Sequence, residues 1–352
     1  MKLQTPFWLF NWMGAFPVAY DPKRGTFVTS RLGLSIAFVH VALVGFHVHR
    51  YLVMLFFGVI KKTSAVSAIV LSMNGFGQLV VLVRRIALAS DTAQCYNSLS
   101  EWPIDVSVRT SYAVVVYAST GAVFLEFVGD NVERWMTNKE MNLDLLSIYA
   151  FVGFELQLIH TFHIIGQLYS DLNAYVKSGL IDDLERIHQA RQRNLALYVF
   201  CKKFNSHYNI DLIIHLSCYQ LYVLLVLFKF VRNLLSSMES DDFFHSLLDL
   251  KIIVRIIRMT RLFLVFVYLI ESSSYLHNKS VFTFYYILRN RMNFLKLQTK
   301  EQLYLFLNEL NATEITITAN HCYNVDKKFL YSVCGSIVAY LVLVVSFLHN
   351  RF

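Results

Sequence analysis

Seven apolar windows, each about as long as a lipid bilayer is thick, constrain the fold of this chain more than any motif in it. A helix needs roughly 20 mostly apolar residues to cross the hydrocarbon core. Windows of this kind lie at 33–57, 64–83, 110–129, 145–166, 212–231, 252–270 and 329–348. Only four prolines and 13 glycines interrupt the 352 residues, which favours helices over the short alternating strands of a membrane barrel. The sequence therefore predicts an all-α polytopic membrane protein with seven transmembrane helices.

The distribution of lysine and arginine predicts how these helices are oriented. Segments 1–32, 84–109, 167–211 and 271–328 together hold 20 such residues, whereas the segments on the opposite side hold seven. Because cytoplasmic loops carry the excess of positive charge, we expect the N-terminus inside and the C-terminus outside. A G-protein-coupled receptor would have the opposite orientation. The formal net charge of +8 mostly reflects this bias, so it does not indicate a nucleic-acid partner.

This topology divides the chain into four segments. We expect a cytosolic or interfacial N-terminal segment (1–32), a six-helix ligand-sensing bundle (33–270) with cytosolic helices around 167–211, a cytosolic helical anchor segment (271–328), and a last helix with a short outside tail (329–352).

Two stretches expected to be cytosolic, 180–204 and 282–310, carry apolar residues at helical spacing, such as Ile187 and Leu195 in the first and Leu307 in the second. Each stretch reads as a helix that extends beyond the bilayer. A helix with one apolar side must bury that side against another surface. Other copies of the chain would supply this surface if the helices formed an oligomerisation hub. Packing of the two helices on each other within one subunit is the alternative.

The last apolar window carries a stripe of small, aliphatic and weakly polar residues. At about 100° per residue, Ala339, Leu343 and Ser346 share one face, and Tyr340 and Phe347 share the next. If several copies of this helix faced a common axis, Leu343 would form a hydrophobic ring that gates by dewetting. The Ser346 hydroxyl would offer oxygen to a passing cation. Alternatively, Ser346 bonds its own helix backbone and the stripe is an ordinary helix contact.

The same window carries a resemblance to a known family. Ala339-Tyr340, five hydrophobic residues and then Ser346-Phe347 resemble the C-terminal signature of the insect gustatory receptor family, which is a Thr-Tyr pair, five hydrophobic residues and Gln-Phe. Tyr340 and Phe347 match, while Ala339 replaces threonine and Ser346 replaces glutamine. Near the start, Gly14-Ala15-Phe16-Pro17 is similar to the Gly-x-x-Pro element found before the first helix of such receptors.

The resemblance implies a seven-helix receptor of the plasma membrane that is itself a ligand-gated cation channel. It implies a homotetramer, or a heteromer with related receptors, that is opened by a small-molecule tastant. The last helix would line the pore, with Leu343, Ser346 and Phe347 near the gate and Tyr340 packed inward. Four serines offer shorter and weaker dipoles than four carboxamides, so the replacement at Ser346 leaves ion selectivity open. A non-conducting receptor that needs a partner subunit is the alternative.

Ionisable residues inside a membrane indicate functional sites by default, because their burial is costly. We expect a pocket that opens outward between helices three to six. Its candidate residues are Glu126, Glu155, Tyr222, Arg255 and Arg258. They would orient a small ligand while apolar walls supply affinity. In the alternative reading, Glu126 pairs with an arginine to make its burial tolerable, or the arginines extend to the outer lipid headgroups.

Other function classes lack their signatures. The histidines form no metal-binding pattern, the five cysteines form no CxxC, and no nucleophile elbow or phosphate loop is present. We therefore expect free thiols, no enzyme activity and no cofactor. A membrane transporter stays open as an alternative, although no internal repeat is visible. The lone Gly75-Phe76-Gly77 lies inside a membrane window, where it predicts close helix packing.

Overall fold

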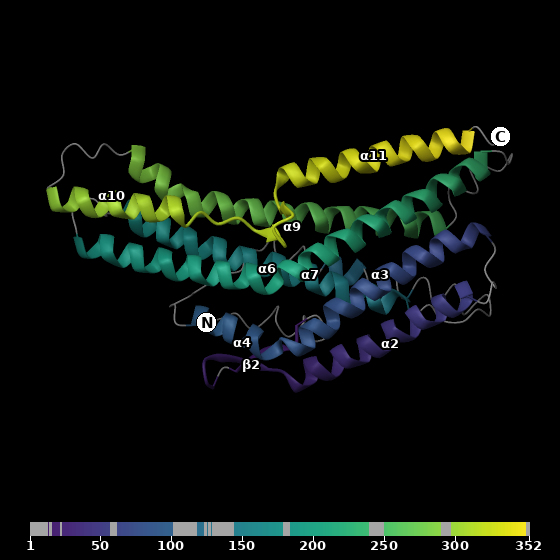
Figure 1. The fold of residues 1–352 in the computed structure, drawn as a ribbon, viewed down its shortest axis with the longest axis horizontal. Coiled ribbons are helices and arrows are strands. Elements are labelled where there is room, and N and C mark those ends of the chain that lie inside the picture. The colour runs from purple at the N-terminus through teal and green to yellow at the C-terminus, as the bar shows by residue number, and fades with distance from the viewer. Residues whose placement is uncertain are drawn as a thin grey trace.

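The chain folds into long helices that lie along one another, with α10 at one end of the molecule and the C-terminal end of α11 at the other (Figure 1). The computed structural model describes residues 13, 16–21, 23–56, 62–100, 118–122, 125, 128, 144–178, 184–238, 250–289 and 297–349. Its helices are α2 (Arg31–Phe56), α3 (Lys62–Ala87), α4 (Ala89–Ser100), α6 (Asp144–Lys177), α7 (Leu184–Met238), α9 (Leu250–Arg289), α10 (Leu297–Ala312) and α11 (Lys327–His349).

Three segments of the described residues are long and apolar enough to cross a membrane, namely Arg31–Phe56, Ala68–Ala87 and Leu184–Phe228. They contain the first, second and fifth predicted windows, apart from a few residues at the window ends. The fourth, sixth and seventh windows lie within α6, α9 and α11. Most of the third window, 110–129, lies outside the described residues. The chain is thus mostly helical and carries several apolar helices, as its sequence predicts.

Three helices continue far beyond the predicted windows. The longest, α7, has 55 residues and is therefore roughly 80 Å long at 1.5 Å per residue. A hydrocarbon core of about 30 Å accommodates less than half of it. The remainder contains the stretch predicted as a cytosolic helix, and α10 packs against it (Figure 1). Of the stretch predicted as a helix at 282–310, the structure describes the end of α9, up to Arg289, and α10 from Leu297, while residues 290–296 lie outside the described residues.

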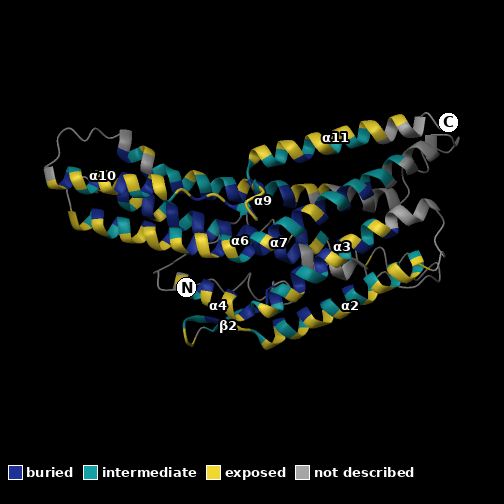
Figure 2. Cartoon of the chain, viewed as in Figure 1, coloured by how far each residue is buried: buried dark blue, intermediate teal, exposed yellow. Residues whose placement is uncertain are grey.

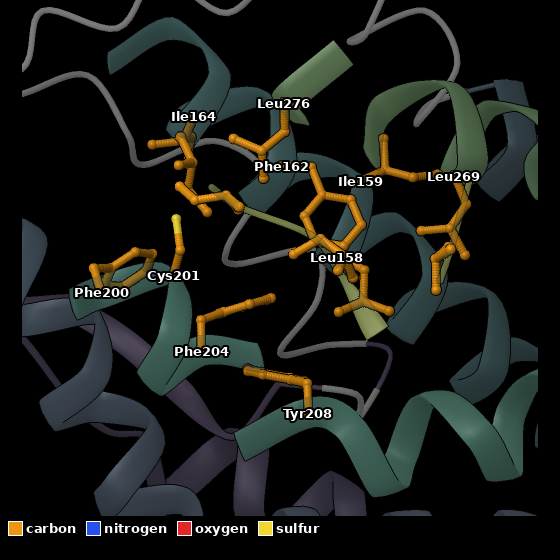
Figure 3. Close-up of a cluster of buried hydrophobic side chains, with 14 of the residues drawn as sticks. Leu158, Ile159, Phe162, Ile164, Phe200, Cys201, Phe204, Tyr208, Leu269 and Leu276 are labelled. Atoms are coloured by element: carbon orange, nitrogen blue, oxygen red, sulfur yellow. The ribbon is translucent and has the colours of Figure 1, made fainter. Parts of the chain in front are cut away.

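A continuous apolar core holds α6, α7 and α9 together. Figure 3 shows side chains from all three helices meeting in it. Its labelled members are Leu158, Ile159, Phe162, Ile164, Phe200, Cys201, Phe204, Tyr208, Leu269 and Leu276. The rings of Phe204 and Tyr208 stack with their centroids 4.3 Å apart. Interiors packed in this way transmit displacement, so the three helices form one mechanical unit.

The close packing predicted for Gly75-Phe76-Gly77 is confirmed. A Cβ atom on Gly75 would lie 2.7 Å from Cγ2 of Val48, and one on Gly77 would collide with Sγ of Cys218. Glycine therefore lets α3 approach α2 on one side and α7 on the other.

Two short hairpins correct the expectation of a purely helical chain. One pairs β1 (Val18–Asp21) with β2 (Thr26–Thr29), and the other pairs β3 (Thr318–Ala319) with β4 (Tyr323–Asn324). Asn97 of α4 fixes the first, because its side-chain amide bonds both the N–H and the C=O of Phe27 at 2.5 and 2.9 Å. Strands of two to four residues are too short for an alternating pattern to show in the sequence.

The outer face of α2 is exposed, as Figure 2 shows by its yellow stretches, and it carries large apolar side chains. Phe38, Val39 and Phe46 are each more than half exposed. A patch of this kind on a membrane-length helix indicates contact with lipid or with another chain rather than with water.

The five cysteines are free, as expected, and differ in accessibility. Cys95, Cys201 and Cys218 are buried, Cys334 is half-buried, and Cys322 is exposed in the second hairpin. Burial raises the pKa of the Cys95 thiol to about 12, so this thiol is protonated and unreactive at neutral pH.

We expect Cys322 to react with a membrane-permeant maleimide in intact cells, and not with a charged methanethiosulfonate added outside, because it is exposed in a segment predicted to be cytosolic. Mass spectrometry after labelling measures this, with Cys322→Ser as the control. Labelling of Cys322 by the external reagent would place the hairpin outside and overturn the predicted topology.

Candidate functional site

The last helix, α11, packs on the bundle with one face and leaves the other open. It contacts α7 and α9, and Val333 on its inner face is 5% exposed. On the outer face Tyr331, Val338, Val342 and Leu343 are 59–70% exposed. Figure 2 shows this open stripe along α11. Because these side chains are large and apolar, the face fits lipid or another protein chain rather than water.

The predicted stripe of the last window coincides with this open face. Ala339, Leu343 and Ser346 are exposed, while Tyr340 is half-buried on the side toward the bundle. The side chain of Phe347 lies outside the described residues. The helical spacing therefore placed Ala339, Leu343 and Ser346 correctly on one face and Tyr340 on another.

A second candidate site is a buried ion cluster between α3 and α7. Asp211 of α7 lies 3.1 Å from Nε of Arg84 and 3.1 Å from Nε of Arg85. The side chains of Asp211 and Arg85 are 1% and 2% exposed, so this pair is closed to solvent, whereas Arg84 is 27% exposed. Buried charges are tolerated only when they are paired, so the cluster fixes α3 against α7.

Aromatic rings complete the environment of Arg85. Its guanidinium lies 4.5 Å from the ring centroid of Phe154 and 3.8 Å from that of Tyr208. Both distances are within cation–π range. Asp211 is shared by two arginines, so one carboxylate faces two positive charges. The two rings add a further attraction for the guanidinium of Arg85.

A second buried pair joins α6 to α7. Nε2 of His215 lies 2.9 Å from Oε1 of Glu155, and both side chains are at most 2% exposed. His215 lies one helical turn from Asp211 along α7. The two pairs therefore form a polar band in which α7 is tied to α3 on one side and to α6 on the other.

A hydrogen-bonded chain extends this band to α4. Nε2 of Gln157 donates to the hydroxyl of Tyr208 at 2.7 Å, and the hydroxyls of Tyr96 and Thr161 lie 2.6 Å apart. Burial raises the pKa of Tyr96 well above its ordinary value, so its hydroxyl stays neutral and can donate or accept. Polar contacts thus connect four helices within an otherwise apolar core.

The predicted pocket residues are found in different settings. Glu155 and Tyr222 are buried, on α6 and α7. Glu126 lies outside the described residues, and so do the side chains of Arg255 and Arg258, which α9 carries. Glu155 is joined to His215, a partner that the sequence did not identify. In the part of the chain that the structure describes, no group of three or more His, Cys, Asp or Glu side chains is placed to hold a metal ion.

Sequence reasoning missed the cluster of Arg84, Arg85 and Asp211. One signal was present, since the two arginines follow the second apolar window directly and the aspartate directly precedes the fifth. The antiparallel arrangement of two neighbouring spans would bring such window ends together. The sequence does not say which of seven spans are neighbours.

Comparison with known proteins finds similar folds among solved structures. The chain superimposes on the insect olfactory receptor OR5 from Machilis hrabei with a TM-score of 0.71, at 10% sequence identity, over 96% of this chain and 95% of the receptor. The structure of that receptor in complex with eugenol gives a TM-score of 0.68 at 10% identity, over 97% and 96%. No protein-family model and no curated protein matches the sequence. The chain thus has the fold of an insect olfactory receptor.

We expect Asp211→Ala to lower the stability of the protein by about 3–5 kcal/mol, because it leaves the buried guanidinium of Arg85 without its counter-charge. Thermal unfolding of the purified protein in lipid nanodiscs measures this. The double variant Arg85→Met/Asp211→Leu is the control and should recover most of the loss, since it removes both buried charges. A melting temperature of Asp211→Ala within about 2 °C of the original protein would contradict this account of the cluster.

Proposed function

We propose that this chain is a chemosensory receptor of the gustatory type and is itself a ligand-gated cation channel of the plasma membrane. The observation that carries the proposal is that the signature-like run Ala339–Phe347 lies on α11, with Ala339, Leu343 and Ser346 on its open face. The likeness of the whole chain to an insect olfactory receptor supports the same class of protein.

In this proposal four copies of α11 surround an ion path. Leu343 is 64% exposed in the single subunit and would be covered when copies meet. A ring of four leucine side chains closes a pore by excluding water. One turn further toward the outside, Ser346 presents hydroxyl oxygens, which are shorter and weaker dipoles than the glutamine of the signature. The channel would therefore be a weakly selective cation pore.

The cytosolic ends of the helices supply a second contact between copies. Part of the predicted apolar stripe is used within the subunit, since Leu307 of α10 is buried. Arg191 of α7 binds Glu309 of α10 through Nε at 2.8 Å. Leu195 and Tyr304, however, stay 56% and 52% exposed. Both packing within a subunit and packing between copies thus contribute to the proposed hub.

The ligand would bind in the outer half of the bundle, between the helices of the third to sixth predicted membrane windows. Glu126, Tyr222, Arg255 and Arg258 are the proposed orienting groups, and Glu155 would act through its pair with His215. One of the matched receptor structures holds eugenol, a small organic molecule, which favours a ligand of similar size here. Such a ligand opens the pore only to the extent that it binds the open form more tightly than the closed form.

We expect Leu343→Ala to raise the current in the absence of ligand several-fold, because a smaller side chain weakens the hydrophobic gate. We expect Ser346→Gln to change the ratio of monovalent cation permeabilities, because a longer carboxamide enters the path. Patch-clamp recording from cells that express the chain, with a panel of tastants including eugenol, measures both.

Leu52→Ala is the matched control, since Leu52 is an exposed leucine on α2, away from the proposed pore. It should leave the current unchanged. If Leu343→Ala and Ser346→Gln also left current and permeability ratios unchanged in protein that reaches the cell surface, the pore assignment would be wrong.

A further inference from the structure

The segment that joins α10 to α11, residues 313–326, is held on the bundle rather than free. We call it the hairpin linker, and it contains β3 and β4. Its apolar side chains Ile315, Ile317, Ala319 and Val325 are at most 4% exposed. The hairpin closes on itself through a bond from the N–H of Val325 to the C=O of Ile317 at 2.8 Å. A connection built in this way behaves as a packed element and not as a flexible tether.

Asn205 of α7 forms hydrogen bonds to the hairpin linker through both the nitrogen and the oxygen of its side-chain amide. Its Nδ2 donates to Oγ1 of Thr318 at 3.0 Å, and its Oδ1 accepts from the N–H of Thr318 at 3.0 Å. The carboxamide therefore fixes both the position and the rotation of β3 on α7. Neither bond forms if α7 turns or slides without taking β3 with it, because hydrogen bonds weaken steeply with distance and angle.

Two further polar contacts hold the start of the hairpin linker. Nδ2 of Asn194, on α7, donates to Oγ1 of Thr313 at 3.0 Å. Nδ1 of His277, on α9, lies 2.8 Å from the C=O of Ile315 and donates to it. The linker is thus attached to α7 and α9, two helices that α11 itself contacts.

Stacked rings continue the attachment from the hairpin linker into α11. Tyr323 of β4 stacks on Phe329 of α11 with centroids 4.4 Å apart and planes 3° apart. Phe329 lies 6.1 Å from Phe266 of α9, which stacks on Tyr219 of α7 at 4.7 Å. Oδ1 of Asp326 caps α11 by accepting from the N–H of Phe329 at 3.0 Å. The first turn of α11 is therefore rigidly joined to the hairpin.

We propose that the hairpin linker is the element that passes a displacement of α7 to α11, and that Asn205 is the positioning residue of this coupling. The inference rests on the proposed function and adds a route by which the gate is moved. Asn205 lies six residues, roughly 9 Å, from Asp211 and its ion cluster along the same helix. A shift of α7 against α3 or α6 reaches Thr318 through this short rigid stretch, and the stacked rings carry it into the helix that holds Leu343.

Hydrogen–deuterium exchange on the full-length protein in lipid nanodiscs tests the coupling without any ligand. In Asn205→Ala, the amides of 318–325 and of the first turn of α11 should exchange about 5–30-fold faster, the size that one or two hydrogen bonds contribute. Thr318→Val, which keeps the backbone bond to Oδ1, should show a smaller increase. Asn209→Ala is the matched control, because Asn209 lies one turn along α7 and accepts from the neighbouring N–H of Ile210.

Faster exchange in the hairpin alone, with the first turn of α11 unchanged, would overturn the inference, since the hairpin would then be loosened without effect on the helix. Unchanged exchange in both segments would overturn it as well. If the same amides also exchanged faster in Asn209→Ala, the effect would be a general loosening of α7 and the inference would be overturned.

Single-channel recording with the tastant panel provides the functional arm. Asn205→Ala should lower the maximal open probability several-fold while the unitary conductance and the permeability ratios stay as in the original protein, because the pore lining is untouched. A changed unitary conductance would place Asn205 in the pore and contradict a coupling role. If the original protein passes no current with any member of the panel, the channel proposal fails, whereas the exchange comparison still decides whether the linker is coupled to α11.

Discussion

A charged side chain inside a helix bundle has no water around it, so another group of the chain must pair with it. In this protein one helix, α7, takes part in these buried pairs. Helix α7 carries Asp211, which pairs with Arg84 and Arg85 of α3, and His215, which pairs with Glu155 of α6. Removing Asp211 would leave the buried guanidinium of Arg85 without its counter-charge, at a cost far above that of a lost surface contact. The arrangement of α3, α6 and α7 depends on these pairs more than on any single apolar contact.

The length of α7 gives this pairing consequences elsewhere. Two further attachments precede its polar band on the same helix, namely the binding of Arg191 to α10 and the hydrogen bonds of Asn205 to the hairpin linker. Helix α11, in contrast, touches the bundle with one face. A helix with one seated and one open face is easier to displace than one packed on all sides. The structure thus combines helices joined by buried polar pairs with a last helix that is seated on one face and joined to the hairpin linker at its first turn.

Much of the fold was predictable because its determinants are local in the sequence. The length of an apolar window and its spacing of side chains sufficed to place most spans, and to put Leu343 and Ser346 on one face with Tyr340 on another. Partner identity was not predictable, since Glu155 and His215 are 60 residues apart, and Asp211 lies far from Arg85 along the chain. The hairpins escaped prediction because strands of two to four residues have no readable period. Glu155 was expected to be a polar residue of a pocket inside the membrane; the structure shows that it is buried, and its partner His215 came only from the tertiary structure.

We propose that the open face of α11 meets other copies of the chain around an ion path. Single-particle electron cryomicroscopy of the protein in lipid nanodiscs tests it most directly. The account predicts four subunits, with Leu343 and Ser346 facing the central axis and apolar contacts between copies at the cytosolic ends of α7 and α10. A monomer, or an assembly in which this face of α11 points to lipid, would contradict it.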